Sequence, residues 1–479
     1  MKYQWVVLTV TTVGVLMAGI ESRIVIVGLP QVASALGADA EQAIWFTQSY
    51  VLGTTIALLL IGRITDIVGR VRIYTFGFGV FTLGSALAGL SRSPLQFILF
   101  RAIQGLGAAM LFTNSLAMIV DATPEGRVGF ALGVNQTAFR FGAVSGLTIS
   151  GLILSFFNWR FLFYLNVPIG IFGTVWAHHR LKEIARLERG ARIDWFGFVA
   201  FSTSIIALLL GLTYEAYGLS ERSTVYFFFL ISAISLFMFI VFERRQDYPL
   251  LDFGLFRIRE FTGGIIAQML NAIAWGAFLL LLSLYFQLIL DLSPLDAGVR
   301  IIPFDIVFLI CGVTAGRLSD KYGHLPFTTL GLGFTSLSLY LFSTLTEAMP
   351  FSRIVIYLAI LGMGTGTFVS PNISSIMSSV PPLRRGVASG LRATFFNVGF
   401  VISLNLAILI MTVTAPYSIV TKLISSISPV DVSGADRMLF IKGLKNTYFW
   451  LSIINLAAIP PSIFRGKRPQ TAELNPAHL

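Results

Sequence analysis

Cysteine and charge are scarce in this sequence. It has one cysteine, Cys311, and only 12% of its 479 residues are Asp, Glu, Lys or Arg. A single cysteine excludes an intrachain disulfide and a thiolate zinc cluster. A soluble domain is about 25% charged and about 45–50% apolar, whereas this chain is 55% hydrophobic with a mean hydropathy of +0.81. That much apolar surface indicates that lipid is part of its solvent.

Motifs for nucleotide binding and for enzymatic chemistry are also missing. No Walker-type phosphate loop is found, which argues against ATP-driven transport. His178 and His179 are adjacent at an expected helix end, and His324 falls in an expected loop, so the histidines form no metal-ligand pattern. A membrane enzyme would need acid and base groups clustered at one membrane face. We therefore expect no enzyme, no cofactor and no metal site.

Long apolar runs recur along the whole chain. A transmembrane helix needs about 20 mainly apolar residues, and fourteen runs approach or exceed this length. They are residues 6–29, 43–62, 73–91, 95–118, 128–155, 160–178, 196–214, 224–242, 262–290, 298–316, 327–346, 353–376, 390–412 and 447–464. The sequence predicts an all-α integral membrane protein with fourteen transmembrane helices.

The positive charges predict the orientation of these spans. If the N-terminus is cytoplasmic, the cytoplasmic segments hold twenty-one Lys and Arg residues and the outer segments hold nine. Cytoplasmic loops are enriched in positive charge, and an even number of spans places both termini on the cytoplasmic side. The net charge of +11 is then explained by topology, and we expect the lipid bilayer rather than nucleic acid as a partner.

Two segments in the predicted cytoplasmic loops resemble each other. Residues 62–70 and 316–324 both follow Gly-Arg-x-x-Asp-x-x-Gly, and residues 127–133 resemble residues 384–390. The two pairs are offset by nearly the same length, 254 and 257 residues. Spans 1–6 therefore correspond to spans 9–14, as in transporters built from two six-helix halves around a midplane site.

This repeat predicts a domain organisation. We expect an N-terminal six-helix bundle over residues 1–180 and a C-terminal six-helix bundle over residues 261–479. Residues 181–260 would supply cytoplasmic linkers and two inserted helices.

The repeated turn can act as a conformational lock. Glycine permits a tight reversal, and the aspartate can cap a helix N-terminus or pair with a basic group. An ordinary charged loop is the alternative, which two copies at matched positions disfavour. The predicted lock residues are Gly62, Asp66, Gly69, Arg70, Gly316, Asp320 and Gly323.

Three stretches resemble the major facilitator superfamily, and within it the fourteen-helix drug:proton antiporter family. Residues 62–74 match the loop signature of the superfamily. Residues 100–109, Phe-Arg-Ala-Ile-Gln-Gly-Leu-Gly-Ala-Ala, are similar to the fourth-helix signature. Residues 158–170, Asn-Trp-Arg-Phe-Leu-Phe-Tyr-Leu-Asn-Val-Pro-Ile-Gly, resemble the stretch that enters helix 6. The resemblance covers essentially the whole chain.

The resemblance implies a proton-coupled exporter of the cytoplasmic membrane. The acid of the first helix and the arginine of the fourth correspond to Glu21 and Arg101, which implies a role in proton coupling. The fifth-helix antiporter signature is altered: Leu147 stands at the proline position and Ser150 at a glycine position, and Arg140 adds a charge nearby. These departures weaken the implied antiport of an ordinary cationic drug.

Ionisable residues inside spans are functional candidates, because their burial must be offset. Glu21, Arg23, Arg101 and Asp305 fall in one layer about 9–12 Å below the outer edge, at ~1.5 Å per residue. Residues two apart on a helix point about 200° apart, so Glu21 and Arg23 each need a partner on another helix. We expect Glu21 to meet Arg101 or Arg140, either as a proton-coupling pair or as a static ion pair.

Asp305 is the acid predicted inside the C-terminal bundle. It is a candidate for a second proton-coupling site, for a substrate anchor, or for a local hydrogen bond to backbone. The predicted substrate cavity consists of Arg23, Arg140, Gln48, Tyr50, Asn135, Gln136, Gln268, Asn271 and Trp275. A mostly apolar pocket with a few polar groups is typical of sites for amphipathic ligands.

The function predicted is proton-coupled efflux of amphipathic drugs or small organic compounds by alternating access. The alternative is transport of an anionic or neutral metabolite that pairs with the buried arginines. The expected partners are a small-molecule substrate, protons and the bilayer, with the protein acting as a monomer.

Overall fold

The structure, a computed structural model, describes residues 2–124, 126–184, 193–217, 221–246, 249–414 and 434–465. Every regular element in these ranges is a helix. The helices of the first part of the chain are α1 (Tyr3–Leu36), α2 (Ala40–Val68), α3 (Arg70–Leu90), α4 (Pro94–Ala122), α5 (Val128–Phe156), α6 (Phe161–Tyr164) and α7 (Asn166–Arg180). A helical pair follows, α8 (Trp195–Tyr217) and α9 (Arg222–Glu243).

The second part of the chain repeats this all-helical organisation. Its α-helices are α10 (Arg259–Trp275), α11 (Phe278–Leu284), α12 (Pro294–Val299), α13 (Ile302–Tyr322), α14 (His324–Phe342), α15 (Phe351–Ser378), α16 (Arg385–Thr412), α18 (Gly434–Leu456) and α19 (Ile459–Ile463). Short 3-10 segments lie at Phe253–Arg257 and Pro382–Arg384, and a π-helical turn at Tyr285–Ile289.

Thirteen helical segments of the described residues are long and apolar enough to span a membrane, in agreement with the first thirteen predicted spans. The fourteenth differs: the sequence predicts residues 447–464, whereas α18 occupies Gly434–Leu456 and α19 follows. Arg437 near the start of α18 binds Asp291 through both guanidinium Nη atoms, at 2.9 and 3.1 Å. The helix therefore begins in a charged stretch that hydropathy does not mark as a span.

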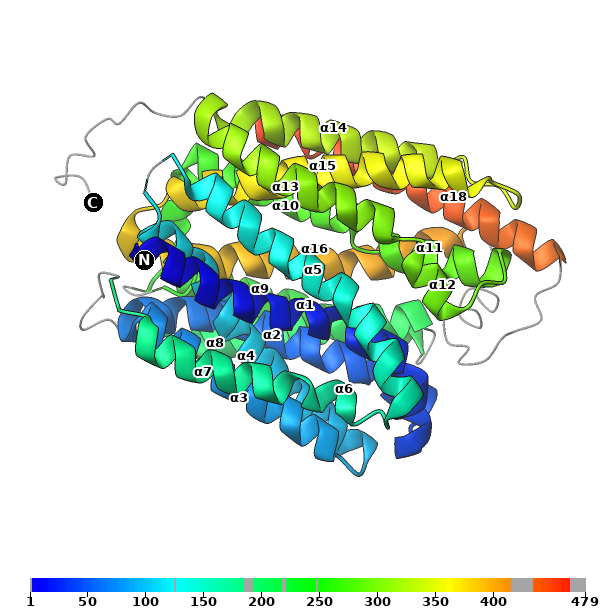
Figure 1. Ribbon diagram of the computed structural model, residues 1–479, viewed down its shortest axis with the longest axis horizontal. Helices are drawn as coiled ribbons and strands as arrows, with labels where there is room; N and C mark the ends of the chain where they lie inside the picture. Colours follow the sequence, from blue (N-terminus) through cyan, green and yellow to red (C-terminus); the bar gives the residue numbers. More distant parts are fainter. Residues whose placement is uncertain are drawn as a thin grey trace.

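Each part of the chain packs mainly on itself. In the first part α1 packs on α5, and α4 packs on both α2 and α3; in the second, α15 packs on both α13 and α14, and α10 packs on α16. Figure 1 shows the blue and cyan helices on one side of the molecule and most of the yellow and red ones on the other. The two parts meet through α5 against α13 and α2 against α16.

The two parts of the chain approach each other closely at the side where α1 begins; we call it the N-terminal side. There Gly62 of α2 lies against the backbone of Gly386, and a Cβ atom on Gly62 would be only 2.9 Å from the Gly386 carbonyl oxygen. Gly133 of α5 lies against Gly312 in the same way, and a Cβ atom on Gly133 would be 2.8 Å from the Gly312 carbonyl oxygen. Only glycine allows such an approach. The lock turns predicted from the sequence lie at this N-terminal side.

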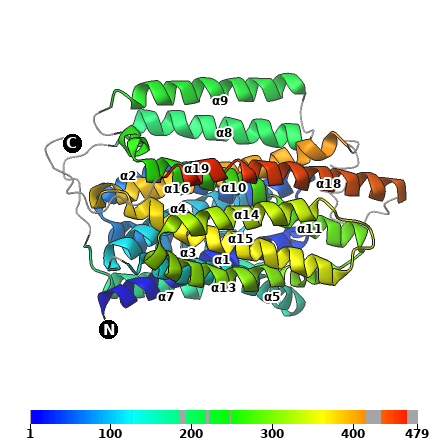
Figure 2. The same cartoon turned by 90° about the horizontal axis from the view of Figure 1, so that it is seen from above.

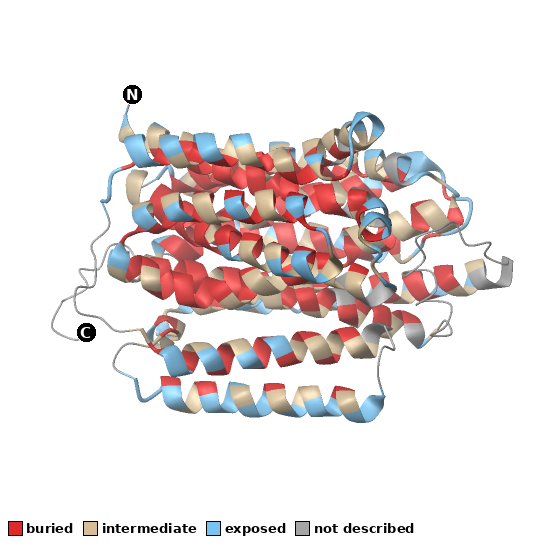
Figure 3. Ribbon diagram, turned by 90° about the horizontal axis from the view of Figure 1, so that it is seen from below, coloured by how far each residue is buried: buried red, intermediate tan, exposed pale blue. Residues whose placement is uncertain are grey.

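Helices α8 and α9 form a separate layer. Figure 2 shows them side by side at the edge of the molecule. Helix α8 contacts α2 and α16, one helix from each part of the chain. Both helices alternate buried and exposed residues along their length, in contrast with the mostly buried interior (Figure 3). The pair therefore lies beside the contact of α2 with α16, one of the two seams along which the parts meet; the other seam is the contact of α5 with α13.

Candidate functional site

Glu21 forms an ion pair with Arg101 inside the first part of the chain. The carboxylate also accepts a hydrogen bond from the Asn166 side-chain nitrogen, at 2.6 Å from Oε2. Both charged residues are buried, with 1% and 3% of their surfaces exposed. The pair joins α1, α4 and α7 in a site from which water is excluded.

Arg101 is held by further contacts around the ion pair. Its Nε donates to the carbonyl oxygen of Phe46 at 3.2 Å, and its Nη1 donates to the side chain of Gln104. Its guanidinium lies 4.6 Å from the centre of the Tyr50 ring. Gln104 and Asn166 belong to the two quoted signature stretches but were not predicted as site residues. The signal that could have found them is their position: both are polar residues inside stretches that match a family signature, and Gln104 lies one helical turn after Arg101.

Asp305 lies between two arginines from the other part of the chain. Arg23 Nη1 is 3.4 Å from Asp305 Oδ2, and Arg140 Nη1 is 4.0 Å from Oδ1. The prediction that Glu21 meets Arg101 or Arg140 thus resolves to Arg101, and the Arg140 option is wrong. Helix α5 presents Arg140 to α13 rather than to Glu21 on α1. A local hydrogen bond to backbone, one of the three roles predicted for Asp305, does not account for its contacts with two arginines. The other two roles, proton coupling and substrate anchoring, stay predictions.

Aromatic rings surround Arg140. Its guanidinium carbon lies 4.5 Å from the ring centre of Phe308, 5.0 Å from that of Trp275 and 5.3 Å from that of Phe304. Rings at these distances attract a cation through their electron-rich faces. Trp275, a predicted cavity residue, therefore lies beside the charged cluster.

The other predicted cavity residues are distributed differently. Asn271 donates to Asn455 at 2.8 Å, and Gln268 donates to the Arg392 carbonyl oxygen at 3.3 Å, so both join helices within the second part of the chain. Asn135 is buried and 3.5 Å from Ser115. The remaining two, Gln48 and Gln136, are half-buried.

The two lock turns bind helix starts across the interface. Asp66 accepts hydrogen bonds from the backbone nitrogens of Gly386 and Val387, at 3.0 and 2.9 Å, in the first turn of α16. Asp320 accepts from Gly129 and Phe130, at 2.9 and 3.0 Å, in the first turn of α5. A carboxylate at a helix N-terminus is stabilised by unpaired N–H groups and by the helix dipole.

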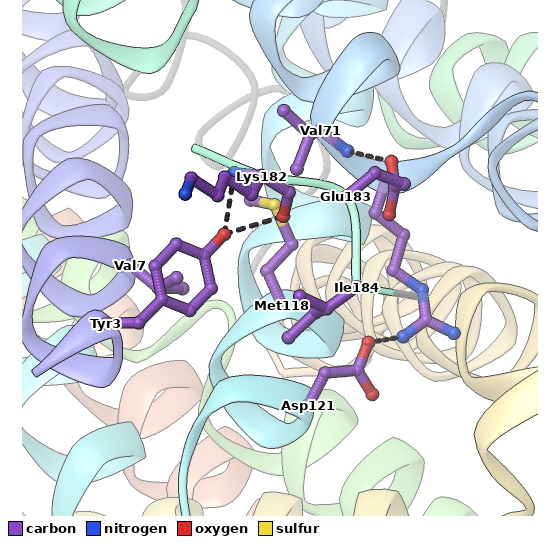
Figure 4. Close-up of a pocket in the computed structure, with 9 residues that line it drawn as sticks. Tyr3, Val7, Val71, Met118, Asp121, Lys182, Glu183 and Ile184 are labelled. Carbon is purple, nitrogen blue, oxygen red and sulfur yellow. Dashed lines mark hydrogen bonds and ion pairs between the residues drawn. The ribbon is translucent and has the colours of Figure 1, made fainter. Parts of the chain in front are cut away.

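The first turn carries an additional charged network. Arg70 pairs with Asp66 at 3.4 Å and with Asp121, and Asp121 pairs with Arg385 at 2.7 Å. Figure 4 shows the Asp121 carboxylate of this network with the dashed line that marks one of its ion pairs. Arg70 also donates to the Pro382 carbonyl oxygen at 2.8 Å. Asp121 and Arg385 were not predicted as site residues. The signal for Asp121 was an acid just after the end of the fourth predicted span, residues 95–118.

Two of the predicted lock glycines have backbone conformations that favour glycine. Gly69 has φ of +118° and Gly323 has φ of +87°, and each separates two successive helices. Beside Gly69, Glu183 accepts a hydrogen bond from the backbone nitrogen of Val71 at 2.9 Å. Gly62 and Gly316 instead lie where the two parts of the chain approach closely.

The site contains charge pairs rather than ligands for a metal. Among the residues that the structure describes, no three His, Cys, Asp or Glu side chains lie together as a metal site would require. The arrangement joins the two parts of the chain through hydrogen bonds and ion pairs between charged side chains and helix starts. Together with the many spans, this defines a multi-pass membrane transporter.

Comparison with known proteins identifies the family. The chain belongs to the Major Facilitator Superfamily, whose family model matches residues 11–404. The chain is 30% identical to a protein named riboflavin transporter RibZ of Clostridioides difficile, over 84% of this chain and 86% of that protein. It is 28% identical to the tetracenomycin C resistance and export protein of Streptomyces glaucescens, over 82% and 73% of the two chains.

Two further comparisons agree. Multidrug resistance protein 3 of Bacillus subtilis is 26% identical over 82% of this chain and 77% of that protein. The solved structure of the proton:xylose symporter XylE has the same fold, with a TM-score of 0.64 at 15% identity over 96% of this chain and 94% of that one. The superfamily and the relatives named as a transporter and as an export protein agree that the chain is a transporter rather than an enzyme.

Proposed function

We propose that this transporter exports small organic compounds across the plasma membrane in exchange for protons, by alternating access. Residues 1–180 and 261–479 would act as the two moving halves, and the inserted pair α8–α9 would accompany them. The N-terminal side would face the cytoplasm, as the positive charges predict. The protein would work as a monomer.

The observation that carries this proposal is the buried Glu21–Arg101 pair. A carboxylate next to an arginine favours its charged form, whereas a buried carboxylate without a cation favours a proton. A change of conformation that separates the two would therefore load Glu21 with a proton, and its reversal would release it. Arginine stays charged throughout, which suits it to this switching role.

The driving force is large enough for efflux. One proton that enters down 100 mV contributes about 2.3 kcal/mol, which supports roughly a fiftyfold substrate gradient. Relatives named for tetracenomycin C export and for multidrug resistance favour outward transport. The lock at the N-terminal side would be closed while the opposite side gives access to the site.

A second candidate is the transport of an anionic or neutral metabolite. The two arginines around Asp305 favour it, because an ordinary cationic drug would be repelled by their excess charge. The relative named as a riboflavin transporter also supports a metabolite substrate.

The experiment uses purified protein in liposomes loaded with a pH-sensitive dye. A gradient of ethidium, a lipophilic cation, or of 2-naphthoate, an organic anion, is imposed, and proton movement is recorded. We expect substrate-driven proton flux in the natural protein and a loss of about tenfold or more in Glu21→Gln. Exchange of labelled substrate across the membrane without a pH gradient should persist in Glu21→Gln.

The matched control is Glu221→Gln, which changes an exposed acid at the start of α9. It should leave proton flux unchanged. Full proton flux in folded Glu21→Gln protein would contradict proton coupling through Glu21.

A further inference from the structure

We propose that Arg23, Arg140 and Asp305 form a binding subsite for the carboxylate of a planar aromatic anion. This inference rests on the proposed transport function and specifies its substrate class. The three side chains come from α1, α5 and α13, so the subsite spans both parts of the chain. A ligand held there would contact both bodies at once.

Charge is the first argument. The cluster has two guanidinium groups and one carboxylate, and the three residues are buried, with 8%, 7% and 1% of their surfaces exposed. Burying an unmatched charge is costly. Glu21 does not supply the missing negative charge, because it pairs with Arg101. The cluster therefore favours a ligand with one negative charge.

Unsatisfied hydrogen-bond donors are the second argument. Arg23 Nη2 and Trp275 Nε1 are buried without a hydrogen-bond partner. The contacts of Asp305 with the two arginines, 3.4 and 4.0 Å, are longer than the about 2.7–2.9 Å of a charge-assisted hydrogen bond. These donors are suited to a carboxylate, which accepts several N–H groups.

The aromatic surroundings define the rest of the ligand. Phe308 and Trp275 lie within 5.0 Å of the Arg140 guanidinium carbon, measured to the ring centres. Aromatic rings pack well against other rings in offset or edge-to-face arrangements. A planar aromatic group attached to the carboxylate would pack here while its charge meets the arginines. A bound carboxylate would compete with Asp305 for the two guanidinium groups.

The experiment compares three probes that share one ring system. These are 2-naphthoate, the neutral 2-naphthalenemethanol and the cation 2-naphthylmethylammonium. Binding to the full-length protein in lipid nanodiscs is measured by equilibrium dialysis with naphthyl fluorescence. We expect 2-naphthoate to bind about tenfold more tightly than the alcohol, because a hydrogen bond to a charged group contributes that much. The cation should bind most weakly, because the two guanidinium groups repel it.

Two substitutions should change the affinity for 2-naphthoate in opposite directions. Arg140→Met should weaken it about tenfold while the alcohol changes by less than about twofold. Asp305→Asn should strengthen it, because the competing carboxylate is removed. A gain in affinity cannot result from misfolding. Arg300→Met is the matched control, since Arg300 lies 4.9 Å from the Phe351 ring centre outside the cluster, and it should have no effect.

Several results would overturn the subsite. They are equal affinity for the three probes, preference for the cation, no binding of any probe, or weaker 2-naphthoate binding in Asp305→Asn. These affinities are measured without a proton gradient. Full proton flux in Glu21→Gln, the result that contradicts proton coupling through Glu21, would therefore leave these affinities unchanged, so the two proposals fail separately.

Discussion

Asp66 accepts a hydrogen bond from the backbone nitrogen of Val387, 2.9 Å away, across the interface between the two parts of the chain. Asp320 makes the equivalent contact with Phe130 at 3.0 Å. The repeated turn of each part therefore binds the repeated helix start of the other part. Asp66 of the first part binds the start of α16, and Asp320 of the second part binds the start of α5.

Neutralising Asp66 should open the N-terminal side. Asp66→Asn removes a charge that binds two backbone N–H groups and Arg70, and hydrogen bonds to charged groups contribute about 1.5–3 kcal/mol each. The readout is maleimide labelling of Ala393→Cys, a buried position in a cluster shared by α2, α4 and α16, in a Cys311→Ala background. We expect labelling to rise about tenfold or more.

Two further substitutions calibrate that result. Asp320→Asn should raise labelling less, because the contacts of Asp66 with Gly386 and Val387 at the start of the labelled helix α16 remain intact. Asp296→Asn, an exposed acid at the start of α12, should not change it. Equal labelling in all variants would show that these carboxylates do not hold the interface closed.

The lock glycines should differ from helical glycines in their response to alanine. Gly69→Ala should destabilise the protein by about 1–3 kcal/mol, because φ of +118° is strained for a residue with a Cβ. Gly79→Ala, in the middle of α3 with no atoms within 4 Å of the added Cβ, should stabilise it by up to about 1 kcal/mol. Apparent melting temperatures in nanodiscs should move in opposite directions, and a shared direction would contradict the backbone argument.

Glu21 and Arg101 should show strong coupling in a double-mutant cycle. Glu21→Ala leaves a buried arginine without its ion-pair partner and should cost about 3–5 kcal/mol. Adding Arg101→Ala should recover part of that loss, since no uncompensated charge remains. Thermal unfolding of the two single variants and the double variant gives the comparison. Additive losses would mean that the pair contributes nothing beyond two separate side chains.

Arg465 should be a destabilising residue. It is 4% exposed, and its three guanidinium nitrogens have no hydrogen-bond partner. Burial lowers the pKa of Arg465 to about 9, while Glu260 acts in the opposite direction. The folded protein thus binds this proton less tightly than the unfolded chain does. At pH values below 9 this difference lowers the free energy of unfolding.

Arg465→Met should therefore raise the melting temperature. Both the folded and unfolded forms are protonated at pH 6–8, so the gain should be constant in that range and should shrink as pH rises through about 9. Arg257→Met, an exposed arginine in the Phe253–Arg257 turn, is the control and should have little effect. A melting temperature lowered by Arg465→Met would show that the guanidinium is stabilised by its surroundings.

Local sequence patterns predicted much of the architecture. Hydropathy located thirteen spans, because lipid requires long apolar helices whatever their neighbours are. It did not locate the start of the last long helix, because α18 begins at Gly434, in a charged stretch where Arg437 contacts the distant residue Asp291. The repeat found both aspartates of the lock, but it could not show that each binds the other repeat.

The charged residues show the same limit. Helical spacing predicted that Glu21 and Arg23 face different ways, and they do meet different partners. Spacing within one helix does not tell which helix lies opposite, so the assignment of Arg140 to Asp305 needed the three-dimensional structure. Asp121 was overlooked because a single acid at a span end resembles an ordinary topological charge.

The position of α8 and α9 makes the two lateral faces of the transporter unequal. Helix α8 contacts both α2 and α16, so that seam is covered by a helical pair. Within the described residues no equivalent pair covers α5 and α13, which are among the less buried of the spans. A molecule dissolved in the surrounding lipid would thus meet this helical pair on one flank and, within the described residues, no such pair on the other. The internal repeat relates the two parts of the chain to each other, whereas the pair α8–α9 makes the two flanks different within the plane of the membrane.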